Sequence, residues 1–223
     1  MIIICTLLTL VSLLLAVLGV AYQHSYVTKN PFSVKRMLKE SSVRKRVFLI
    51  ITLLIFAAMA VLGSIFCEQK EFTSVQMVQN VLLWEGLYLI AWIDFRMKKI
   101  PNLLLLILAG IRVMGIAAEI LVDGQEWLFA ILASLLGMIF GVVIILICMF
   151  FSRGGIGAGD VKLYGIIGLY FGVAGLINIM FHSILIAAIV AVIMLLSRKA
   201  KMKSSLPMAP FVFIGLTVYY IFL

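Results

Sequence analysis

Long apolar runs separated by short charged clusters make up nearly the whole chain. A helix needs about 20 consecutive apolar residues to cross a bilayer. Two of the runs that reach this length each contain one charge, Glu85 in one and Arg112 in the next. We therefore predict an all-α polytopic transmembrane bundle of eight spans, at about 2–22, 47–67, 76–96, 101–121, 127–150, 160–177, 180–197 and 206–223.

The uncharged run at 163–197 is counted as two spans. Its 35 residues are too many for one ordinary helix and just enough for two short ones. Gly172, Gly175, Asn178 and His182 lie where the connecting turn is needed. Counting two spans also keeps the last basic cluster of the chain on the same side of the membrane as the other basic clusters.

The composition excludes several classes of protein. Of the 223 residues, 65% are hydrophobic and 12% are charged, and the mean hydropathy is +1.26. Soluble proteins are about 45–50% apolar and about 25% charged, so a soluble enzyme, a disordered chain and a nucleic-acid-binding domain are excluded. The three cysteines, Cys5, Cys67 and Cys148, form no CxxC pair. Neither a zinc ribbon nor a disulfide framework is therefore indicated, and we expect no metal or other cofactor.

The cations predict the orientation of the chain in the membrane. Sixteen of the 18 Lys and Arg residues fall in four clusters, at 29–46, 96–99, 153–162 and 198–203. All four clusters lie on one side if the spans alternate, and the positive-inside rule makes that side cytoplasmic. The opposite loops are expected to carry the acidic residues Glu68, Glu71, Glu119, Asp123 and Glu126. Both chain termini are then extracytoplasmic, and the net charge of +9 reports orientation rather than a nucleic-acid partner.

The pattern divides the chain into two parts. Residues 1–75 are expected to hold two transmembrane helices and a basic cytoplasmic loop at 23–46, and residues 76–223 a six-span core. The first span begins apolar, without a positive n-region, so we expect an anchor rather than a removable signal peptide. The loop could also lie on anionic lipid, although a solvated loop that sets the orientation is favoured.

Four ionisable residues are expected within or at the ends of the spans. An ionisable residue at membrane depth is costly, so each such residue is a candidate for a functional role. Glu85 lies 12 residues before Met97 and Arg112 lies 12 residues after Ile100, so a helical hairpin between them brings the two to similar depth. We predict that Glu85 and Arg112 form a structural ion pair.

Asp94 and Asp160 are different, because each lies at the cytoplasmic end of a span. Asp160 ends a glycine-rich run, and irregular backbone at membrane depth is tolerated where it lines a cavity or is buried in protein. Asp94 is followed by three cations and by Pro101, which opens the next helix. Two adjacent carboxylates can share a proton and activate water, as in aspartic proteases. The spacing alone also fits solvated carboxylates balanced by nearby cations, or a proton-coupled transporter.

Three segments resemble the ordered signatures of the prepilin peptidases, the bacterial GxGD membrane aspartyl proteases. They are Asp94 with Ile100-Pro101-Asn102, then Gly154-Gly155-Ile156-Gly157-Ala158-Gly159-Asp160-Val161-Lys162-Leu163, and Leu206-Pro207-Met208-Ala209-Pro210-Phe211. A GxGD motif by itself is a weak signal, but three motifs in order at cytoplasmic span edges are specific. The resemblance covers roughly residues 76–223.

The resemblance implies roles for individual residues. Asp94 and Asp160 become the catalytic pair, and Gly157 and Gly159 shape the loop that presents Asp160. Lys162 either tunes this pair or is a cation that only sets orientation. Pro207 and Pro210 would have a packing role. The family removes the basic leader from type IV pilin-like precursors at the cytoplasmic face of the plasma membrane, so such precursors are the expected partners, with the oligomeric state left open.

The chain departs from the longer members of this family, which carry a cysteine-rich cytoplasmic insertion and also N-methylate the new pilin terminus. The loop at 29–46 has no cysteine and is too short for that insertion. The resemblance therefore favours the shorter, peptidase-only members that serve tight-adherence (Flp) pili or related secretion systems. The alternatives are a proton-coupled transporter or a pilus or secretion assembly protein, and a GxGD protease of the presenilin or signal-peptide-peptidase type.

Overall fold

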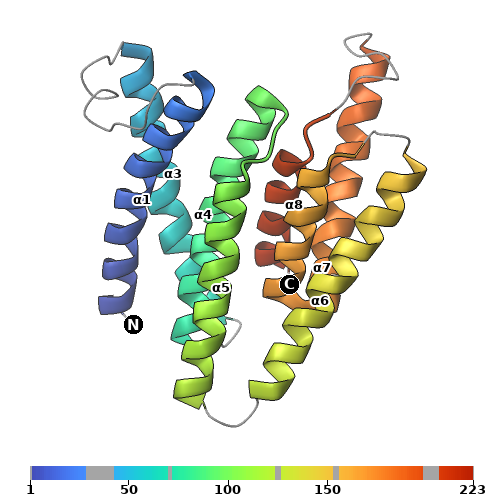
Figure 1. The fold of residues 1–223 in the computed structure, drawn as a ribbon. Helices are drawn as coiled ribbons and strands as arrows, with labels where there is room; N and C mark the ends of the chain where they lie inside the picture. Colours follow the sequence, from blue (N-terminus) through green and yellow to red (C-terminus); the bar gives the residue numbers. More distant parts are fainter. Residues whose placement is uncertain are drawn as a thin grey trace. The chain divides into compact units, whose positions relative to one another are not determined.

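The computed structural model describes residues 2–28, 43–69, 72–123, 127–152, 156–197 and 206–222. These residues form helices and connecting segments, without a β-strand among them, which confirms the all-α prediction (Figure 1). The helices are α1 (Ile2–Thr28), α3 (Val43–Gln69), α4 (Ser74–Met97), α5 (Asn102–Asp123), α6 (Trp127–Phe151), α7 (Ala158–Leu196) and α8 (Ala209–Phe222). Residues 29–42, 153–155 and 198–205 hold most of the predicted basic clusters and the start of the glycine run, and they lie outside the described residues.

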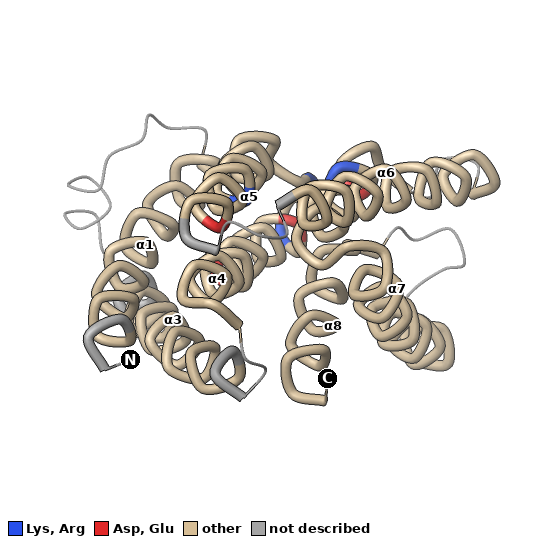
Figure 2. The backbone as a smooth tube through the Cα atoms, turned by 90° about the horizontal axis from the view of Figure 1, so that it is seen from below, with Lys and Arg blue, Asp and Glu red and all other residues tan. Residues whose placement is uncertain are grey.

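Among the residues that the structure describes, five helices are long and apolar enough to cross a membrane: α1, α3, α5, α6 and α7. This confirms the prediction of a multi-pass membrane protein. Lys, Arg, Asp and Glu are sparse along the described helices (Figure 2). The predicted spans at 76–96 and 206–223 are also helical, as α4 and α8, but α4 is more polar and α8 has only 14 residues.

The chain divides into two compact units, Met1–Glu85 and Gly86–Leu223, so the boundary falls inside α4. In the first unit, α1, α3 and the first half of α4 pack around Leu8, Ala60 and Val81. A capping box begins α4, since the Thr73 N–H donates to Gln76 Oε1 (3.2 Å) and the Gln76 N–H to Thr73 Oγ1 (3.3 Å).

The second unit holds the rest of α4 and α5 to α8. Its helices approach closely where glycines lie opposite one another. Gly137 of α6, for example, lies against Gly168 of α7. A side chain at either position would overlap the backbone of the other helix, so small residues are required at this crossing.

Helix α7 is broken at Gly172, as the length of the run at 163–197 predicts. Gly172 has φ 64° and ψ −168°, a conformation that residues with a side chain rarely adopt. The chain reverses there into two antiparallel arms, 158–171 and 173–196 (Figure 1). The break comes at the first of the four candidate turn residues, several residues before the boundary expected between the two spans. We call residues 158–171 the first arm of α7.

Candidate active site

The second unit brings the three signature segments together. Asp94 lies near the end of α4, and Asn102 begins α5. Asp160 lies in the first turn of α7, and Ala209 is the first residue of α8. Side-chain and backbone contacts connect these helix ends, so residues more than 100 positions apart in sequence form one cluster.

The Asp94 carboxylate is bound by the N-terminus of α8. The backbone N–H of Ala209 donates to Asp94 Oδ2 (3.0 Å), and the backbone N–H of Met208 also acts on this carboxylate. The Met208 carbonyl accepts from the N–H groups of Phe211 and Val212 (3.0 and 3.1 Å), which makes Met208 the residue that caps the helix. Asp94, which is 5% exposed, thus accepts from N–H groups that have no partner inside α8.

This contact gives the third signature a role beyond packing. The sequence predicts that Pro207 and Pro210 hold the start of the last span near the aspartates. The structure places the backbone amides between these two prolines against Asp94 itself. Sequence reasoning missed them because a backbone donor leaves no mark in the identity of its residue.

Asp160 is held by its own loop. It is the third residue of α7, and its Oδ2 accepts a hydrogen bond from the Gly157 N–H (3.0 Å). The Asp160 N–H in turn donates to the Gly157 carbonyl (3.0 Å). This reciprocal pair closes the first turn and fixes the direction of the carboxylate. Asp160 is partly exposed, whereas Asp94 is buried.

The two loop glycines differ in what they require. Gly157 has φ −87° and ψ 156°, which is extended backbone that any residue adopts. A Cβ added to it would meet Asp160 Oδ2 at 3.5 Å, an ordinary contact. A Cβ added to Gly159 would lie only 3.0 Å from the Cβ of Ile100. Gly159 therefore permits close approach between the first turn of α7 and the segment before α5.

The segments that carry Asp94 and Asp160 contact one another, because a Cβ on Gly159 would lie 3.0 Å from the Cβ of Ile100 and Lys162 binds Asn102; the Asp160 charge acts on Asp94. The hydrogen bond recorded for the Lys162 side chain goes to Asn102 rather than to either carboxylate. Lys162 Nζ donates to Asn102 Oδ1 (3.0 Å), and both residues are exposed. The Lys162 contact joins the second signature to the first. The site as described holds a buried and a partly exposed carboxylate in one cluster of helix ends, each bound by a backbone N–H group.

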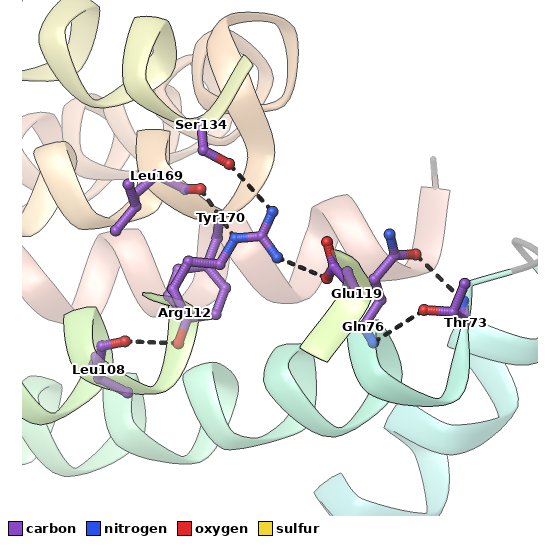
Figure 3. Close-up of polar contacts among 8 residues, drawn as sticks. All are labelled: Thr73, Gln76, Leu108, Arg112, Glu119, Ser134, Leu169 and Tyr170. Carbon is purple, nitrogen blue, oxygen red and sulfur yellow. Dashed lines mark hydrogen bonds and ion pairs between the residues drawn. The ribbon is translucent and has the colours of Figure 1, made fainter. Parts of the chain in front are cut away.

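The predicted ion pair of Arg112 with Glu85 remains a prediction, because Glu85 belongs to the first unit. Within its own unit, Arg112 already has a carboxylate partner: Nη1 lies 2.9 Å from Glu119 Oε1 (Figure 3). The charge pattern predicted that Glu119 lies in a loop, and this prediction is wrong. Glu119 lies inside α5 and is 8% exposed. Its spacing of seven from Arg112, two helical turns, was the available signal.

No group of three or more His, Cys, Asp and Glu residues that could hold a metal ion occurs in the part of the chain that the structure describes.

Comparison with known proteins agrees with the first two signatures. The type IV leader peptidase family matches residues 81–192, half of the chain, including Asp94 and Asp160. The chain is also 28% identical over 149 residues to a prepilin leader peptidase/N-methyltransferase of Bacillus subtilis (strain 168), an alignment that covers 67% of this chain and 57% of that protein. The chain thus spans little more than half of that relative. No solved structure matches the chain. The resemblance predicted from the three signatures is confirmed: the chain belongs to the type IV leader peptidase family.

Proposed function

We propose that the protein is a membrane aspartyl endopeptidase that removes the basic leader peptide from type IV prepilin-like precursors. Membership of the type IV leader peptidase family supports the reaction and the class of substrate. The observation that carries the proposal is the contact between the segments that carry Asp94 and Asp160 on separate helices, with each carboxylate bound by a backbone N–H group.

In this mechanism the two carboxylates act as one unit. One is ionised and deprotonates a water molecule, which attacks the scissile carbonyl, while the other donates a proton to the developing oxyanion. The roles belong to the coupled pair rather than to either residue. The N-terminus of α8 supports the charged form of the pair, because its N–H groups and its dipole favour an anion.

The orientation of the site follows from the charge pattern. With the basic clusters in the cytoplasm, both aspartates lie on the cytoplasmic side of the plasma membrane, where a basic leader is accessible, and both termini lie outside. Single cysteines placed at 29–46 and at 124–126, in a chain without its three native cysteines, test this orientation. An impermeant maleimide applied to intact cells should label only the cysteines at 124–126, and the reverse pattern would reject the orientation.

We further propose that the protein does not methylate the new pilin terminus. The Bacillus relative is named for both activities, but the loop at 29–46 lacks the cysteines of the longer members. Mass spectrometry of the mature pilin distinguishes the two outcomes, since methylation adds one methyl group to the N-terminal residue. The same spectrum locates the cut: cleavage before the apolar helix fits a leader peptidase, and cleavage inside it fits the presenilin-type alternative.

The central experiment follows leader removal by gel shift during co-expression with a prepilin precursor. The chain has three aspartates, which allows a matched design: Asp94→Asn and Asp160→Asn test the pair, and Asp123→Asn is the control. We expect cleavage by the wild type and by the control and none by either test variant. Cleavage retained in either test variant would reject the dyad, and a wild type inactive on several precursors would reject the function.

A further inference from the structure

Arg112 lies outside the dyad and contacts three helices of the second unit. It is 8% exposed and projects from the middle of α5. Its guanidinium donates from three nitrogens to acceptors on α5, α6 and α7 (Figure 3). A charge so deeply buried is costly unless it is paired and hydrogen-bonded, so its precise placement calls for an explanation beyond membrane orientation.

Arg112 contacts α7 near the last residue of the first arm, next to the break at Gly172. We call this the closed end of the arm. Arg112 Nε donates to the carbonyl oxygen of Leu169 (3.2 Å), three residues before the break at Gly172. The last carbonyls of a helix lack partners within it, and a cation is favoured at this end of the helix dipole. Arg112 therefore caps the first arm from a neighbouring helix.

The next residue of α7 strengthens this attachment. The Tyr170 hydroxyl donates to the carbonyl of Leu108 (2.8 Å), one turn before Arg112 on α5. The guanidinium carbon of Arg112 lies 5.8 Å from the centre of the Tyr170 ring, a cation–π distance. Two consecutive residues at the end of the arm are thus held by α5.

The remaining nitrogens connect the cap to the rest of the unit. Nη2 donates to Ser134 Oγ of α6 (3.2 Å), and Nη1 to Glu119 Oε1 of α5 (2.9 Å). This arrangement uses the planar, forked geometry of arginine, which a lysine ammonium cannot reproduce. The cap is fixed on two sides and cannot follow a shift of α7 without breaking these bonds.

Asp160 lies at the opposite end of the same arm. Leu169 lies nine positions after it along the helix, a rise of roughly 14 Å. The arm is buried from residue 163 to residue 170, and Leu163, Tyr164 and Ile167 are each 0% exposed. A packed helical rod transmits a tilt at one end to the other, because protein interiors are close-packed and transmit strain.

We propose that Arg112 is a positioning residue for Asp160: by capping the closed end of the first arm of α7, it sets the distance and orientation of Asp160 relative to Asp94. This inference rests on the proposed function for its catalytic consequence. Its structural part, the attachment of the first arm, is independent of any activity. Arg112 touches neither aspartate, so it acts through the arm.

The decisive variant removes the cap without leaving an unpaired charge. Arg112→Leu combined with Glu119→Leu takes away both partners of the ion pair, so a loss that remains cannot be due to an orphaned carboxylate. We expect the double variant to fold and to cleave prepilin with kcat lowered about 10- to 100-fold, the scale of an approximately 1 Å misplacement of catalytic groups, and with KM within about twofold. The pH profile of kcat should change shape, because the coupling of two carboxylates depends on their separation.

Two single variants grade the effect. Arg112→Lys keeps the positive charge but loses the forked guanidinium. It should lower kcat and change the shape of the pH profile in the same way as the double variant. Ser134→Ala removes one bond and leaves the Leu169 contact, so its effect should be the smallest of the series. Wild-type kcat and pH profile in Arg112→Lys would overturn the proposal, and so would their full recovery in the double variant, since Arg112 would then only neutralise Glu119.

Hydrogen–deuterium exchange separates this proposal from the proposed function. The double variant should exchange the amides of 158–175 faster than the wild type, with α1 and α3 of the first unit unchanged. Unchanged exchange in the arm would overturn the positioning role even if activity fell. If the wild type cleaves no prepilin, the proposed function fails, while faster exchange in the double variant would still support the attachment of the arm by Arg112.

Discussion

The two ends of the first arm of α7 hold charge in opposite ways. At its start, the Asp160 carboxylate accepts from the Gly157 N–H, and the neighbouring Asp94 accepts from the N-terminus of α8. At its closed end, the Arg112 cation donates to the Leu169 carbonyl. Anions therefore meet N–H groups at helix starts and a cation meets a carbonyl at a helix end, as the helix dipole favours.

The charged groups at the two ends of the first arm have different roles. The Asp160 end brings together two carboxyl groups, one buried and one partly exposed, and in the proposed function these share a proton, because both cannot easily ionise at short range. The Arg112 end is buried, and its charges are of opposite sign and hydrogen-bonded. The comparison predicts that one end determines activity and the other determines where the first end points.

The largest expected effect is a contrast between the two ends in stability. Arg112→Leu by itself leaves Glu119 buried without this guanidinium, and breaking such a pair costs about 3–5 kcal/mol. Asp160→Asn keeps an oxygen that can accept from Gly157 and should leave stability nearly unchanged, while it lowers cleavage by at least about 100-fold, the scale of general acid–base catalysis.

Thermal unfolding in detergent, measured beside leader cleavage, checks this contrast. Arg112→Leu should unfold at a clearly lower temperature than Asp160→Asn, and the added Glu119→Leu change should restore much of the difference. If Arg112→Leu were as stable as Asp160→Asn, the guanidinium would not be balancing a buried charge and the contrast between the ends would be lost.

The next effect concerns the donors to Asp94. Ala209→Pro deletes the N–H that binds Asp94 Oδ2, yet proline is well tolerated at the first position of a helix. We expect a loss of about tenfold in kcat/KM, since removing one donor to a charged group costs about 1.5–3 kcal/mol at most. Ala209→Gly keeps the N–H and is the matched control. Equal activity in the two variants would mean that the Ala209 amide does not orient Asp94.

The features that could be predicted from the sequence differ between the two ends of the arm. Asp94, Asp160 and the break near Gly172 were predictable, because ionisable residues and glycines interrupt the apolar runs and stand out from them. The α8 amides and the Leu169 carbonyl were not, because every residue carries a backbone donor and acceptor, and only the fold decides which are left unpaired. The pairing of Arg112 with Glu85, predicted from matching depth, stays a prediction; depth gave no sign of the contact with Glu119, because it says nothing of the direction in which a side chain faces.

A smaller effect is expected at the loop glycines, and it separates them. Gly159→Ala places a Cβ 3.0 Å from the Cβ of Ile100, so the first turn of α7 must shift by a few tenths of an ångström, and Asp160 with it. We expect cleavage to fall several-fold, within the loss of about 100-fold that a displacement near 1 Å can cause. Gly157→Ala, in extended backbone with room for a methyl group, should lose less. A larger loss in Gly157→Ala would show that the loop needs the backbone freedom of Gly157 after all.

The smallest effect is expected at Lys162, and it tests where the active site ends. Its ammonium is exposed and bound to Asn102 rather than to a carboxylate, and an exposed polar contact contributes about 0–1 kcal/mol. Lys162→Gln should therefore change kcat less than about threefold and leave the pH profile of cleavage in place. Asn102→Ala removes the same contact without removing charge, so it should behave alike. A displaced pH profile in Lys162→Gln but not in Asn102→Ala would mean that the ammonium acts on the dyad through its charge, and the catalytic end of the arm would then include this residue.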